Sequence, residues 1–349
     1  MGSVIRNPYL HPHKHPLFMD TLDAIETDNQ QRLPENHPVV SLILLLTLVF
    51  GGALLIGALS IGIGLVATGG TGKAGISSIL EVGTANIDFI KIVQAGSSMG
   101  MFVIPPLLFA AIERRKTHYL NFKSKVNPAL WLLVIAIMFF SAPVLDQSIK
   151  LNERLTLPES FSGIEDWMKA KEAELERLTE LLLSDTTYQG LLINLLVIAV
   201  IPAIGEEFLF RGCVQNIVTR WFKSVHLGVW ITAIVFSAIH LQFYGFLPRM
   251  LLGALFGYLL VWGRNIWLPV LAHFLNNAAA TVSAFYLQRQ GRSLKEMDFG
   301  DQIPPYLYFV SFALTALLLY QYFKTSAETL RPKRRRRTPE NGNHGKKLD

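Results

Sequence analysis

Residues 39–67 are VVSLILLLTLVFGGALLIGALSIGIGLVA, a run without any Asp, Glu, Lys or Arg. An α-helix needs about 20 apolar residues to cross the roughly 30 Å hydrocarbon core of a bilayer, so this run predicts a transmembrane helix. Further stretches without those residues follow at 92–112, 126–145, 186–205, 224–248, 250–263, 265–288 and 302–323. We therefore predict an all-α fold, a polytopic membrane helix bundle of about eight transmembrane helices. The predicted number of transmembrane helices is seven if the short stretch between Arg249 and Arg264 does not cross the membrane.

The composition excludes an ordinary soluble fold. Charged residues make up 17% of the 349 residues, whereas soluble proteins contain about 25%. The single cysteine, Cys213, cannot form a disulfide within the chain. The net charge of +6 arises entirely within residues 331–349, which hold eight Lys or Arg and two acidic residues. A basic tail after a last span is typical of a cytoplasmic anchor, so we expect a lipid bilayer, and no nucleic acid, as its partner.

Basic residues between the predicted spans indicate the orientation of the chain. They cluster at 114–125, at 211–223, at Arg264 and in the tail, on segments that alternate so as to share one face of the membrane. The positive-inside rule makes that face cytoplasmic. Both termini are then expected in the cytoplasm, and the membrane is interpreted as a bacterial inner membrane. The polar segment 1–38 lacks the apolar core of a cleavable signal peptide.

The spans divide the chain into segments. These are expected to be a polar cytoplasmic N-terminal segment (1–38), three transmembrane helices (39–145), an extracytoplasmic helical insertion (146–185), a membrane domain rich in polar motifs (186–288), a last transmembrane helix (302–323) and a basic, disordered cytoplasmic tail (324–349). The insertion has an apolar stripe and a charged face over 165–183, typical of an amphipathic helix on the membrane surface or capping the bundle. A substrate gate is the alternative.

Two adjacent carboxylates close the fourth predicted span, in the stretch IGEEFLFRG at 204–212. A charged residue at the centre of a membrane costs roughly 2.5–3.5 kcal/mol on insertion scales. Glu207 and Arg211 are four residues apart on one helical face and can pair. Glu206 points about 100° away from that face and is available for another role, such as general acid or base catalysis. The simpler alternative is that both acids lie in the headgroup region.

Polar residues also interrupt the fifth and seventh predicted spans. His240 follows Phe236 by four residues, and His273 and Asn277 share one face of the seventh span. An imidazole and an amide can both donate hydrogen bonds to a developing oxyanion. Hydrogen bonding between packed helices is the alternative for each of them, and we assign it to Asn276, which faces elsewhere.

These polar residues form a set, because each avoids lipid only by facing the interior of one bundle. A carboxylate and a histidine can deprotonate a water, and a second histidine with an amide can hold the oxyanion, which suffices to hydrolyse an amide bond. The alternative is a metal site, in which Glu206, His240 and His273 would bind zinc and leave one position open for water.

The three motifs closely resemble those of the CPBP intramembrane proteases, a family that includes the CAAX prenyl endopeptidases and the Abi-type proteins. The matching residues are Glu206-Glu207-x-x-x-Arg211, Phe236-x-x-x-His240 and His273-x-x-x-Asn277, in order on successive apolar helices. The resemblance covers roughly 186–284. It implies that Glu206 and His240 activate water, that His273 and Asn277 stabilise the oxyanion, and that Glu207 and Arg211 support them. Members are described both as metalloproteases and as metal-independent proteases, so the zinc question stays open.

The expected function is therefore an intramembrane endopeptidase that cleaves a membrane-associated protein or peptide. One alternative is a non-catalytic membrane partner, such as an immunity protein, for which Glu206 and His240 would be dispensable. Another is a proton-coupled transporter that uses the same polar groups as a proton path. The absence of repeated halves in the sequence disfavours a transporter.

Overall fold

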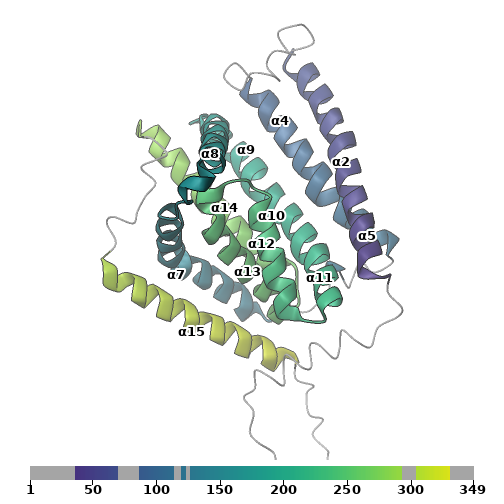
Figure 1. Ribbon diagram of the computed structural model, residues 1–349, viewed down its shortest axis with the longest axis vertical. Coiled ribbons are helices and arrows are strands. Elements are labelled where there is room, and N and C mark those ends of the chain that lie inside the picture. The colour runs from purple at the N-terminus through teal and green to yellow at the C-terminus, as the bar shows by residue number, and fades with distance from the viewer. Residues whose placement is uncertain (1–35, 70–85, 114–118, 123–125, 293–303, 331–349) are drawn as a thin grey trace, which may run out of the picture.

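The computed structural model describes residues 36–69, 86–113, 119–122, 126–292 and 304–330. Within these residues the chain is helical and contains no strand, which confirms the all-α prediction (Figure 1). The predicted N-terminal segment lies outside the described residues except for 36–38, and the tail lies outside them from 331 onward, while residues 324–330, predicted as disordered, belong to the last helix. The elements are α2 (Pro38–Ala67), α4 (Ile87–Ser98), η1 (Met99–Val103), α5 (Ile104–Ile112), α7 (Pro128–Glu153), η2 (Glu159–Phe161), α8 (Ser162–Leu183), α9 (Tyr188–Asn194), η3 (Leu195–Val200), α10 (Ile201–Glu206), η4 (Glu207–Val214), α11 (Gln215–Phe222), α12 (Val225–Ala238), η5 (Phe243–Gly245), α13 (Phe246–Gly263), α14 (Trp267–Arg289) and α15 (Pro305–Leu330).

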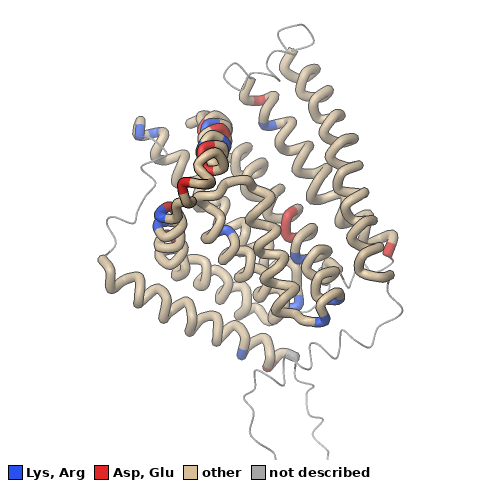
Figure 2. Tube along the Cα trace, in the orientation of Figure 1, with Lys and Arg blue, Asp and Glu red and all other residues tan. Residues whose placement is uncertain are grey.

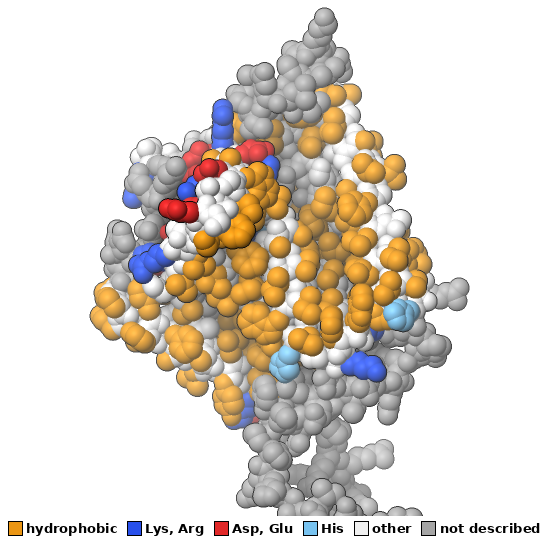
Figure 3. All heavy atoms as spheres, in the orientation of Figure 1, with side chains coloured by type: hydrophobic (Ala, Val, Ile, Leu, Met, Phe, Trp, Pro, Cys, Tyr) orange, Lys and Arg blue, Asp and Glu red, His pale blue; other side chains and the backbone are white. Residues whose placement is uncertain are grey.

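Six helical segments in the described part of the chain are long and apolar enough to cross a membrane. They are Pro38–Ala67, Ile87–Ile112, Pro128–Glu153, Tyr188–Phe222, Phe243–Gly263 and Pro305–Thr329. Their outward-facing side chains are large and apolar, and Figure 3 shows them covering most of the visible surface outside α8. Lys, Arg, Asp and Glu lie at the ends of the bundle and along α8, apart from a few within the bundle (Figure 2). The protein is an integral membrane protein.

Two predicted spans are not among these six. The fifth became α12, which has only 14 residues because it ends at Ala238. The seventh became α14, which has 23 residues but carries His273 and two asparagines in its middle, and these lower its hydropathy. Both helices belong to the bundle, so six of the eight predicted stretches lie in segments that qualify as spans by length and composition, and the other two are helices packed among them. The short stretch between Arg249 and Arg264 belongs to a segment that is long and apolar enough to span, because α13 begins at Phe246, before Arg249.

The longest span contains the two adjacent glutamates. The prediction ended this span at Gly205, but α9 to α11 continue without a break to Phe222. Glu206 therefore lies in the middle of a 35-residue helix rather than at its end. The prediction was wrong because it treated the charges as a helix terminus, whereas the bundle surrounds them.

Proline explains two π-helical turns in the spans. A proline has no N–H and its ring clashes with the preceding helical turn. The π-helical η1 ends just before Pro105 and Pro106, and the π-helical η3 ends just before Pro202. Gly205 lies where these two irregular helices touch, since a Cβ there would come within 2.8 Å of the Phe102 side chain. The close approach brings α10 against η1.

The packing of helices places one end of α10 at the centre of the molecule. The segment α2 packs against α4, η1 and α5, while α15 packs along α7 at the edge of the bundle (Figure 1). The segments α10 and η3 pack against α14, and α12 packs against α13. A buried cluster that includes Phe109, Tyr119, Phe208, Phe210 and Phe236 joins the first group to the second.

Candidate active site

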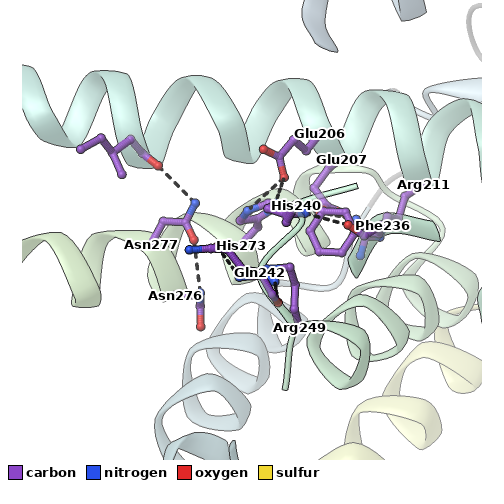
Figure 4. A network of polar contacts seen from close by, with 11 residues as sticks. Glu206, Glu207, Arg211, Phe236, His240, Gln242, Arg249, His273, Asn276 and Asn277 are labelled. Atoms are coloured by element: carbon purple, nitrogen blue, oxygen red, sulfur yellow. Dashed lines mark hydrogen bonds and ion pairs between the residues drawn. The ribbon is translucent and has the colours of Figure 1, made fainter. Parts of the chain in front are cut away.

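The carboxylate of Glu206 faces two histidines that come from two other segments. Its Oε2 lies 3.8 Å from Nε2 of His273 on α14 and 3.9 Å from Nε2 of His240, just after α12 (Figure 4). Both separations are too long for direct hydrogen bonds. They suit a bridging water, which can connect polar groups at such distances. Three polar side chains therefore converge on one point within the bundle.

In each histidine, the hydrogen bond at Nδ1 determines which ring nitrogen carries the hydrogen. Nδ1 of His240 lies 2.7 Å from the carbonyl oxygen of Phe236, and Nδ1 of His273 lies 2.8 Å from Oε1 of Glu207. Both partners are acceptors, so each Nδ1 carries the hydrogen. In a neutral ring Nε2 then keeps its lone pair. Both Nε2 atoms face the carboxylate of Glu206 (Figure 4).

Glu207 and Arg211 form a fully buried ion pair behind these residues. Both side chains are 0% exposed, and Arg211 Nη1 donates to Oε1 of Glu207 at 2.9 Å. Arg211 Nη2 donates to the carbonyl oxygen of Gly253 at 3.0 Å, which ties η4 to α13. The same Oε1 of Glu207 accepts from His273. The pair therefore neutralises a buried charge and also orients the His273 ring.

Two phenylalanine rings pack against the histidines and the arginine of the site. The Phe236 ring packs edge-on against His240, with centroids 5.0 Å apart, and lies 4.5 Å below the guanidinium of Arg211. The Phe256 ring stacks on His273 at 5.3 Å. Packed aromatic rings restrict the rotamers of both histidines, and a cation over an aromatic face is attracted to it. Phe236 thus contacts both the ion pair and one histidine.

Backbone geometry places His240 at the level of Glu206. Since α12 ends at Ala238, the chain turns immediately after the histidine, and Leu241 has a φ of 54°. Left-handed backbone costs a non-glycine residue about 1–2 kcal/mol. The strained turn keeps His240 inside the bundle and directs Gln242 toward the same region (Figure 4).

The amide of Asn277 is held by the backbone carbonyl of Ile198, four residues before Pro202. In an α-helix the N–H of residue 202 would bond to the carbonyl of Ile198, but proline has no N–H. Asn277 Nδ2 donates to that carbonyl at 3.2 Å, and Asn276 Nδ2 donates to Oδ1 of Asn277 at 3.2 Å. One N–H of the Asn277 amide is left for another acceptor. Asn276, assigned from sequence to helix packing alone, instead positions Asn277.

These residues line a cavity of about 810 Å³. Glu206, His240, His273, Asn276 and Asn277 form its polar wall. The opposite side is largely apolar, and much of it comes from the helix α8. The apolar lining includes Leu145 and Ile149 of α7, Leu175, Leu178, Leu182 and Leu183 of α8, and Leu252 of α13. The apolar side of α8 thus packs over the site, as the capping interpretation of this amphipathic helix expects.

Arg249 is the basic residue in the described lining of this cavity. Its Nη2 donates to Oε1 of Gln242 at 2.7 Å and its Nη1 to the Gln242 carbonyl at 3.4 Å. Across the cavity, burial raises the pKa of Glu172 on α8, while the nearby N–H of Tyr244 and the charge of Arg249 offset part of that rise. The sequence prediction treated Arg249 only as the charge that bounds a short span.

The donor chemistry around Glu206 resembles a zinc site. Two imidazole Nε2 atoms and a carboxylate face one point, and each histidine donates its other N–H to an oxygen, a common arrangement behind metal ligands. However, the described residues contain no group of three or more His, Cys, Asp or Glu arranged to hold a metal ion. We therefore derive no catalytic step through a metal, and zinc at these residues stays a prediction.

The segment that contains the site residues also matches a known protein family. Residues 188–279, about a quarter of the chain, match the family described as type II CAAX prenyl endopeptidase Rce1-like. This segment is similar to that family. The resemblance to the CPBP intramembrane proteases is thereby confirmed, and the family is one of membrane proteases.

A curated relative of the chain comes from a bacterium. The uncharacterized protein YpbD of Bacillus subtilis (strain 168) is 27% identical over 89 residues, which cover 24% of this chain and 42% of YpbD. The chain thus aligns with less than half of that relative. No solved structure matches the chain.

The Rce1-like segment brings the six predicted site residues together, with two differences from the expected arrangement. Arg211 was counted among loop charges that indicate orientation, but it is buried in the bundle and carries no such information. Glu207 was expected to pair with Arg211 alone, but it also accepts from His273. That contact has no sequence signal, since the two residues are 66 positions apart. Arg249 could have been noticed as a charge beside an apolar stretch.

Proposed function

We propose that the protein is an intramembrane endopeptidase of the CPBP type, which hydrolyses peptide bonds of a membrane-associated protein or peptide. The convergence of Glu206, His240 and His273 in one cavity carries this proposal. The Rce1-like match at 188–279 supports the same reaction class.

Glu206 and His240 activate the water. A water between them donates one hydrogen to Oε2 of Glu206 and the other to Nε2 of His240, which has its lone pair there. Its own oxygen lone pair then faces the substrate carbonyl. As the oxygen attacks the carbonyl carbon, Glu206 takes the water proton, and it later delivers that proton to the leaving amine nitrogen. Base catalysis of this kind contributes about 10²–10⁴-fold to a rate.

His273 and Asn277 stabilise the tetrahedral oxyanion. Asn277 offers the amide hydrogen that Ile198 does not use. His273 donates from Nε2 only when both ring nitrogens are protonated, since Nδ1 already donates to Glu207. Glu207 accepts from Nδ1 and holds the ring in the orientation from which Nε2 can donate. Donors fixed before the reaction stabilise such a transition state without reorganisation.

The cellular setting is part of the same proposal. We place the protein in a bacterial inner membrane with both termini in the cytoplasm. The bacterial relative supports the first statement, and Arg220, Lys223, Arg264 and the basic tail support the second. The apolar side of the cavity, including the α8 leucines, suits an apolar stretch of substrate.

A comparison of protein termini in membranes tests the proposal. Membranes of the native host are prepared with the wild type or with Glu206→Gln, matched for the amount of folded protein. New termini that appear only with the wild type are expected, and they identify the substrate and the cleaved bond. Identical termini in both samples would contradict proteolysis and favour the non-catalytic partner. A proton-coupled transporter would instead show pH-driven uptake in proteoliposomes that Glu206→Gln abolishes.

Metal removal distinguishes the two ways of activating water. We expect the purified protein to keep its activity after dialysis against a chelator, because the water is held by Glu206 and His240 directly. Peptide cleavage before and after dialysis measures this, with metal content determined on the same samples. Loss of activity that added Zn²⁺ restores would instead assign Glu206, His240 and His273 as metal ligands.

A further inference from the structure

Arg249 is a cation in the lining of the cavity, and among the described residues it has no acidic partner in contact. Both of its side-chain hydrogen bonds to described residues go to the neutral Gln242. Within the described residues no carboxylate lies within the 4.0 Å that defines an ion pair with this guanidinium. By contrast, Arg211 is neutralised by Glu207 at 2.9 Å. A guanidinium withdrawn from bulk water gains most from a carboxylate that it can contact with two N–H groups.

The position of Arg249 connects it to the reaction. It lines the same cavity as Glu206, His240 and His273, and Figure 4 shows it with Gln242 beside the two histidines. Gln242 follows His240 by two residues, across the strained turn at Leu241. The hydrogen bonds to Gln242 therefore fix the guanidinium relative to the histidine that holds the water. A group bound at Arg249 would position the substrate relative to the attacking water.

The neighbours of Arg249 indicate what it would bind. The charges of Glu172 and Glu206 act on it from beyond ion-pair distance. A ligand carboxylate in direct contact gains two charge-assisted hydrogen bonds, whereas its repulsion from the more distant acids falls with distance. The rest of the lining from α7 and α8 is aliphatic except for Glu153, Glu172 and Thr179. The ligand expected is thus an apolar peptide segment that bears a carboxylate.

We propose that Arg249 is a specificity-determining residue that binds a carboxylate of the peptide substrate. The carboxylate comes either from the C-terminus of the substrate or from an acidic side chain. The proposal rests on the endopeptidase function above and adds the substrate group that the cavity selects.

The test uses one short fluorescent peptide with an aliphatic end, in three versions: with a free C-terminal carboxylate, with a C-terminal amide, and with a C-terminal amide plus one aspartate near the end. Binding to the full-length protein in detergent is measured by fluorescence anisotropy in the Glu206→Gln background, and KM and kcat are measured with Glu206 intact. We expect a carboxylate version to bind about 10- to 100-fold more tightly than the plain amide, as for hydrogen bonds to charged groups. The version that binds tightly identifies the source of the carboxylate.

Replacement of the arginine should remove this preference. Arg249→Gln is expected to raise Kd and KM for the preferred version to those of the amide, and Arg249→Lys to restore part of the preference. Glu172→Gln is the matched control, because a merely structural Arg249 would act by holding α8 through Glu172. An unchanged preference in Arg249→Gln, or an equal loss in Glu172→Gln, would overturn the proposal. A binding preference without cleavage by the wild type would uphold the carboxylate site and contradict the proposed endopeptidase.

Discussion

Glu206→Gln is expected to lower the kcat for peptide cleavage by at least about 10³-fold, within the range for removal of a general base. Glutamine keeps the size of the side chain but cannot take the water proton. His240→Gln should lower kcat by a similar factor, because the water would lose the acceptor at Nε2. The double variant is expected to be no slower than the slower single variant, since residues that act as one unit are non-additive. The measurement is single-turnover cleavage of a substrate identified from the membrane termini.

A surface carboxylate provides the control for this prediction. Glu174 lies on the exposed side of α8 and pairs with Lys171 at 2.8 Å, outside the described lining of the cavity. Glu174→Gln makes the same chemical change and should leave kcat within about 2-fold, as expected for a surface substitution. Independent, multiplicative losses in the double variant would show that Glu206 and His240 do not hold the same water.

Arg211→Met is expected to destabilise the folded protein by about 3–5 kcal/mol, the range for breaking a buried ion pair by removal of one partner. The change leaves the Glu207 carboxylate buried with only His273 as a partner, and it also removes the hydrogen bond to Gly253 and the contact with Phe236. Thermal unfolding in detergent, followed by circular dichroism, measures the loss.

Two further variants distinguish the contribution of the buried ion pair to stability from that of side-chain packing. Lys171→Met removes an exposed ion pair of similar length and should change stability by no more than about 1 kcal/mol. Combining Glu207→Gln with Arg211→Met should recover much of the lost stability, because no buried charge is left unpaired. If Arg211→Met unfolds at the same temperature as Lys171→Met, the buried pair does not stabilise the bundle.

The motifs predicted the composition of the site more reliably than its depth. Glu206, His240, His273 and Asn277 were selected because each is costly in lipid, and all four line the cavity. Their roles in catalysis stay predictions. The predicted position of Glu206 along its helix was wrong, because a charge in the sequence was taken as the end of a span. Here Glu207 is compensated inside the bundle by Arg211, so the helix continues past both glutamates to Phe222.

The sequence by itself determined that the chain is an α-helical membrane protein, because long apolar runs are local and the bilayer requires every backbone group to bond within its own helix. It also determined which polar residues must face inward. Only the tertiary structure decided that His273 bonds to Glu207, that Asn277 takes the carbonyl opposite Pro202, and that Arg249 faces the cavity beneath α8. Such contacts join residues far apart in the chain, and their formation depends on how whole helices pack.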